Sequence, residues 1–122
     1  MSYTKTVMGA GTSAVQAAAI VGGVNATISA AGTTQGTATV LYPLGLHTVT
    51  TVTAATGVIL AIGALGDETV IFNGGANTLL VYPPVGAKIN NLTTNTGINL
   101  AVNTAILLKC ASATQWIGIL SA

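Results

Sequence analysis

Charged side chains are almost absent from this sequence. There are three lysines, no arginine, and two acidic residues, so only 4% of the 122 residues are charged. An ordinary soluble domain carries about 25%. Nucleic-acid binding requires Lys or Arg beside the phosphates, and three scattered lysines with a net charge of +1 do not supply them. We therefore expect no nucleic-acid partner.

Long apolar runs are also missing, although 51% of the residues are hydrophobic. The most apolar run, Val58–Leu65, is far shorter than the roughly 20 residues that a membrane-spanning helix needs, so we expect no membrane partner. A surface with so little charge can instead be kept from water by burial against sister subunits, because obligate interfaces resemble a domain core cut in half. The composition thus predicts a homo-oligomer.

Side chains suited to catalysis are few. The chain has one histidine, one cysteine and two adjacent acids, Asp67 and Glu68. Neighbouring residues of a strand point to opposite faces, so these two carboxylates would not converge on a substrate, and we expect them in a solvated loop. The sequence therefore predicts a protein that is not an enzyme, with no catalytic or cofactor-binding residues and no cofactor.

The remaining reactive side chains have structural interpretations. Cys110 cannot form an internal disulfide, because it is the only cysteine, and it is expected to be a small buried apolar residue. His47 is interpreted as a surface or interface residue, and the sequence predicts no metal site. Only a ring of three His47 side chains on a symmetry axis would offer several metal ligands. Trp116 is expected to anchor the core of the last strand, with sugar stacking as the alternative.

Helix-forming patterns are scarce, because Gly and the β-branched Thr and Val recur throughout. Short alternating or β-branched segments lie between turn signals instead, at spacings typical of a sandwich or barrel. We therefore predict an all-β fold, a β-sandwich or barrel of short antiparallel strands. The predicted strands are Val24–Ala30, Thr37–Tyr42, His47–Thr53, Gly57–Ile62, Glu68–Phe72, Thr78–Tyr82, Lys88–Leu92, Ile98–Val102, Ala105–Cys110 and Gln115–Leu120.

One turn has a strong local signal. Asn73-Gly74-Gly75 contains residues that accept the positive φ of a tight hairpin turn. The sequence therefore predicts that Glu68–Phe72 and Thr78–Tyr82 pair antiparallel. Pro83-Pro84 should end the second of these strands, because proline cannot donate to a ladder.

A stretch of the chain is repeated with an offset of 40 residues. Thr39–Ala61 aligns with Leu79–Ala101 without a gap, and the Tyr42-Pro43 pair matches Tyr82-Pro83. Tyr and Pro are rare here, which makes this match more informative than those of Thr or Ala. We predict a duplicated structural unit, with repeat halves at about residues 33–66 and 67–122, each covering the apolar face of the other.

The beginning of the chain differs from the rest. Residues 1–12 are small and polar, and we predict a flexible N-terminal arm that could add to a neighbour's sheet edge. Residues 13–122 form the predicted single all-β domain. Thr12–Ile20 is the best helix candidate, although an extended strand or arm is favoured for it.

The run Glu68–Ile119, "ETVIFNGGANTLLVYPPVGAKINNLTTNTGINLAVNTAILLKCASATQWIGI", resembles a C-terminal module of small virion proteins of tailed bacteriophages. It covers about two-fifths of the chain, and the first 60 residues show no such likeness. The distinctive residues are Val81-Tyr82-Pro83-Pro84, Gly86, Ile89-Asn90 and Trp116.

The resemblance implies an all-β capsid decoration (cement) protein that sits on the virion surface, is trimeric, and has the major capsid protein as its partner. It implies no catalytic residues. The alternative is a head-fibre or tail-fibre tip module that binds host glycans through an exposed Tyr or Trp116.

Overall fold

The computed structural model describes residues 24–41, 45–61 and 63–121. Within these ranges the fold is all-β, as predicted, with one short 3-10 helix, η1 (Gln35–Thr37), and strands at all ten predicted places. The strands are β1 (Val24–Ser29), β2 (Thr39–Leu41), β3 (Leu46–Thr51), β4 (Gly57–Leu60), β5 (Glu68–Asn73), β6 (Leu79–Tyr82), β7 (Lys88–Ile89), β8 (Ile98–Leu100), β9 (Ala105–Ser112) and β10 (Gln115–Leu120). The predicted arm and the helix candidate Thr12–Ile20 lie outside the described residues.

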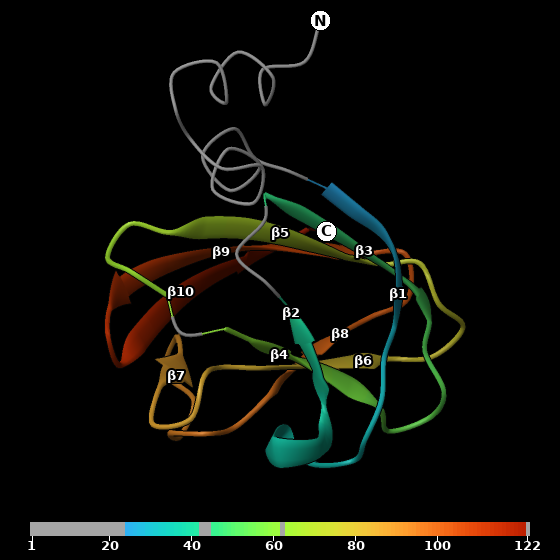
Figure 1. The fold of residues 1–122 in the computed structure, drawn as a ribbon, viewed down its shortest axis with the longest axis horizontal. Helices are drawn as coiled ribbons and strands as arrows, with labels where there is room; N and C mark the ends of the chain where they lie inside the picture. The colour runs from blue at the N-terminus through green and yellow to red at the C-terminus, as the bar shows by residue number, and fades with distance from the viewer. Residues whose placement is uncertain (1–23, 42–44, 62, 122) are drawn as a thin grey trace, which may run out of the picture.

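The strands form two sheets that lie one above the other (Figure 1). One sheet has six strands in the order β1-β3-β5-β9-β10-β7, and the other has four in the order β2-β4-β6-β8. The chain passes from one sheet to the other and back in each turn. The strands β1, β3 and β5 are mutually parallel neighbours, and so are β2, β4 and β6.

This path corrects the predicted architecture, because the first half of the fold is a short β-solenoid rather than an antiparallel sandwich or barrel. Successive coils begin at Val24, Leu46 and Glu68, a spacing of 22 residues. The antiparallel pairs occur only where the last strands return, at β5–β9, β9–β10 and β6–β8. Alternation of apolar and polar residues indicates a strand but does not give the direction of its neighbour, so the sequence pattern could not separate the two architectures.

The predicted hairpin of β5 and β6 is wrong, since these strands lie in different sheets. The turn at Asn73 is a corner of the solenoid. The Asn73 side chain is fully buried, and its Nδ2 donates to the carbonyls of Asn77 and Leu100, both at 2.9 Å. Its Oδ1 accepts from the backbone N–H of Gly75 at 3.0 Å. These bonds hold the chain as it leaves β5, so the segment crosses to the other sheet instead of folding back.

The repeat with an offset of 40 is related to the fold only in part. Its equivalent segments place β3 and β7 in one sheet and β4 and β8 in the other. However, β4 runs parallel to its neighbour β6, whereas β8 runs antiparallel to it. The two stretches therefore supply similar strands to the same layers, but they are not two copies of one three-dimensional unit. The division into halves at 33–66 and 67–122 stays a prediction.

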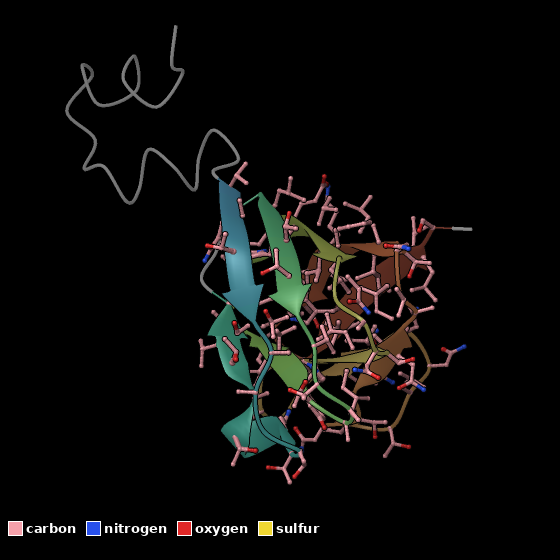
Figure 2. The ribbon with its side chains drawn as sticks, turned by 90° about the vertical axis from the view of Figure 1, so that its right-hand side faces the viewer. Atoms are coloured by element: carbon pink, nitrogen blue, oxygen red, sulfur yellow. The ribbon has the colours of Figure 1, made fainter. Side chains whose placement is uncertain are left out.

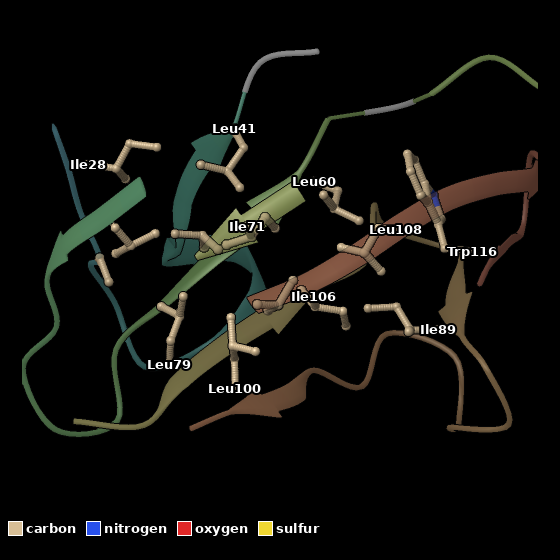
Figure 3. Close-up of a cluster of buried hydrophobic side chains, with 14 of the residues drawn as sticks. Ile28, Leu41, Leu60, Ile71, Leu79, Ile89, Leu100, Ile106, Leu108 and Trp116 are labelled. Carbon is tan, nitrogen blue, oxygen red and sulfur yellow. The ribbon is translucent and has the colours of Figure 1, made fainter. Parts of the chain in front are cut away.

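The hydrophobic core fills the space between the two sheets (Figure 3). Side chains of the six-stranded sheet such as Ile71 and Ile106 meet Leu79 and Leu100 of the four-stranded sheet, and all four are fully buried. Each contributes about 1.5–3 kcal/mol relative to an exposed position. Trp116 lies in the same cluster and is 4% exposed, which confirms the predicted core anchor. None of the buried side-chain N or O atoms of the described residues lacks a hydrogen-bond partner.

Candidate functional site

Five apolar side chains form a continuous row across the six-stranded sheet, and we call this row the outer ladder. It consists of Val24, Leu46, Val70, Leu107 and Ile119. Consecutive members are direct register partners on β1, β3, β5, β9 and β10. Neighbouring strands lie about 4.8 Å apart, so the row spans about 19 Å. Residues that face each other across a strand pair share one face of the sheet.

The outer ladder faces away from the core. On β9 the inward side chains of Ile106 and Leu108 are fully buried, and Leu107 between them points to the other face. On β10 the buried Trp116 precedes Ile117 and Ile119, which are 45% and 65% exposed. Figure 2 shows side chains projecting from both faces of the sheets. Within the described residues no strand or helix pairs onto this outer face.

An open groove runs over β9 and β10 on the same face. It encloses about 370 Å³ and is lined by Leu107, Lys109, Cys110, Ala111, Ile117 and Ile119. All but one of these residues are uncharged and largely apolar. Exposed apolar surface that is contiguous, rather than scattered over single residues, typically marks a contact with another molecule. The groove therefore extends the outer ladder into a candidate protein interface.

Charge at this face is confined to one pair. Glu68 and Lys109 are register partners in the row next to the ladder, and Ile117 completes that row on β10. The Lys109 Nζ lies 3.6 Å from the Glu68 Oε2, and both side chains are more than half exposed. An exposed ion pair contributes little to stability. Its effect here is to leave the face with no net charge.

His47 does not lie at the surface, so that prediction is wrong. It shares the inward face of β3 with Val49 and is only 1% exposed. Its Nδ1 lies 2.9 Å from the Thr69 hydroxyl of the neighbouring strand β5. The alternation of β3 decides this outcome, because a residue two positions from a core valine faces the core.

The two acids are placed apart, as expected from their adjacency. The Asp67 Oδ2 accepts from the backbone N–H of Ala64 at 2.7 Å and closes the turn before β5. Glu68 opens β5 and is directed to Lys109. No cluster of three or more His, Cys, Asp or Glu side chains that could hold a metal ion occurs in residues 24–41, 45–61 and 63–121. The absence of enzymatic activity stays a prediction.

Cys110 is buried, as predicted, at the inward face of β9. Burial raises the pKa of its thiol, the nearby Asp67 carboxylate raises it further, and a backbone hydrogen bond with Ser112 partly lowers it. The Sγ–H donates to the Ser112 carbonyl at 3.1 Å. A thiol with a raised pKa is a poor nucleophile at neutral pH. Cys110 therefore acts as a core residue.

The aromatic side chains do not form a sugar platform in the described part of the chain. Trp116 and Tyr82 are both buried, and Phe72 is half-buried. Stacking against a sugar ring needs an exposed aromatic face. The glycan-binding alternative based on Trp116 thus lacks an accessible side chain, while Tyr3 and Tyr42 lie outside the described residues.

Sequence comparison adds no family to this picture. No protein-family model matches the chain, and no curated protein sequence matches it. Among the described residues there is also no helix of the length and hydrophobicity required to span a membrane.

Proposed function

We propose that the protein is a structural component of a virus particle, a decoration protein that acts as a homo-oligomer on the capsid of a tailed bacteriophage. Its partners in this proposal are further copies of itself and the major capsid protein. The resemblance of Glu68–Ile119 to virion modules supports this role, and implies a trimer. The observation that carries the proposal is the outer ladder.

The outer ladder supports an assembly role because its side chains are exposed although they are those of a core. Burying apolar surface contributes about 25 cal/mol per Å². A partner that covered Leu107, Ile117 and Ile119 would therefore gain stability without pairing any charge. The described surface offers no comparable concentration of charged groups that would bind a small polar ligand.

The solenoid also suits a protein that must stay folded on a particle. Each coil is held by parallel ladders on two sides, and the corner at Asn73 is fixed by buried hydrogen bonds. Such a unit keeps its outer face rigid, so little conformational entropy is lost when a partner binds.

The experiment is reconstitution on capsids stripped of their decoration proteins. We expect the wild-type protein to sediment with the capsids and to raise their resistance to heat. The Ile117→Lys variant should sediment far less, because a charge would be buried in the contact. The matched control is Val40→Lys, since Val40 is 54% exposed on the four-stranded sheet. Wild-type protein that stays in the supernatant would contradict the proposal.

A further inference from the structure

We infer that the outer ladder is covered by the outer ladder of a second copy of this chain, packed face to face about a twofold axis. The inference deepens the proposed function and rests on its claim that the protein works as an assembly, but not on attachment to a capsid. It names the occupant of the face and the symmetry of the contact.

Shape is the first argument for a second copy. The outer ladder is a straight row of branched apolar side chains on a twisted sheet, and two such faces pack well against each other at about 10 Å. The groove beside Leu107 and Ile119 can receive side chains that project from the facing sheet. A twofold axis gives both copies the same contact, which is the commonest symmetry of homo-oligomers.

Charge is the second argument. Glu68 and Lys109 stand next to each other at the border of the ladder. A face that carries one charge of each sign is complementary to itself, since a twofold rotation can bring the Lys109 of one copy toward the Glu68 of the other. A partner with a patch of a single sign would find no counterpart here. The copy of this chain, with five charged residues in all, matches the face.

Size gives the strength of the contact. The row spans about 19 Å, and with a flanking row on each side it covers on the order of 400 Å² per copy. Stable interfaces bury about 800 Å² per partner. The contact is therefore at the weak end of specific interfaces, and we expect association that depends on protein concentration in the micromolar range.

The test uses opposite charges at one ladder position. Leu107→Lys and Leu107→Glu are prepared separately in the full-length chain, and sedimentation is measured for each variant and for their equimolar mixture. Like charges across the contact should weaken association of either variant about tenfold or more. The mixture should recover association, because Lys of one copy then faces Glu of the other. Val40→Lys and Val40→Glu form the control pair on the opposite sheet and should leave association unchanged.

Circular dichroism and thermal unfolding of all four variants report whether each is folded, and Ile119→Lys with Ile119→Glu is the second pair if either Leu107 variant unfolds. Recovery in the mixture supports the inference. Variants that are each monomeric and stay so when mixed would overturn it, and so would a wild-type trimer. A face already covered by residues 1–23 of the same chain, or one used only for the capsid, would show no effect of these charges on mass in solution. Each of these results leaves capsid attachment to be judged by its own experiment.

Discussion

The ring of Tyr82 lies directly over Gly57 of the neighbouring strand. A Cβ atom at Gly57 would stand 2.8 Å from the Tyr82 Cε2 and 2.7 Å from the Leu80 carbonyl oxygen. No side chain therefore fits at Gly57 without moving β6. On the other side of the ring, a Cβ at Gly97 would be 3.1 Å from Cδ1. The Tyr side chain is thus buried between glycines of β4 and of the segment before β8.

Gly57→Ala should therefore destabilise the protein. The added methyl group must displace either backbone or an aromatic ring, and overpacking of this kind costs about 1–3 kcal/mol. The free energy of unfolding, measured by urea denaturation, checks this. Gly36→Ala is the matched control, because a Cβ at Gly36 meets nothing within 4 Å. Equal stability of the two variants would show that the Tyr82 ring is not packed as described.

Asn73→Ala should be more harmful than its exposed position in a turn sequence suggests. The substitution removes both Nδ2 donations and the acceptor of the Gly75 N–H. Buried backbone groups are left without partners, which costs about 2–4 kcal/mol in total. Asn99→Ala serves as control, since Asn99 is exposed on β8. Thermal unfolding of both variants decides the matter, and a loss at Asn73 no larger than at Asn99 would contradict the corner role.

The sequence predicted where the strands lie but not how they pair. Alternating residues placed all ten strands, because a half-buried strand repeats every two residues whatever its neighbour does. The Asn73-Gly74-Gly75 turn was read as a hairpin, since the same residue types suit a tight turn and a corner. What decides is whether the Asn73 side chain finds carbonyls beneath the sheet, and one of these belongs to Leu100, 27 residues away.

The candidate interface was foreseen only as a shortage of charge. The sequence did contain a signal, because the run Ala105–Leu108 is apolar at both inward and outward positions, which is typical of a strand covered on both faces. The burial of His47 was likewise readable from its spacing to Val49. The ladder as a whole was not, because its members come from five strands and meet only through the register of the sheet.

The thiol of Cys110 should ionise only at alkaline pH. Because its folded pKa lies above the ordinary 9.0, the unfolded chain loses this proton first. The contribution of Cys110 to stability is therefore complete below pH 9.0 and is lost as pH rises through the folded value. Thiolate absorbance followed against pH measures this. Asp67→Asn should lower the folded pKa, because it removes a negative charge that raises it. Glu68→Gln is the control, and an equal shift in both variants would contradict the assignment to Asp67.

Trp116 offers a probe of the core, because it is the only tryptophan. Its burial predicts blue-shifted fluorescence that resists quenching by acrylamide and shifts to the red on unfolding. Host oligosaccharides should leave the emission unchanged, since no sugar can reach the ring. Strong quenching of the folded protein, or a change of emission on addition of a glycan, would instead support the fibre-tip alternative.

The central claim is that the uncharged outer face is buried by assembly, and the mass of the wild-type protein in solution tests it most directly. Sedimentation equilibrium over a range of concentrations should give a mass that rises above the 12.0 kDa of one chain, toward twice that value. A soluble protein that stays at 12.0 kDa at every concentration would contradict the account.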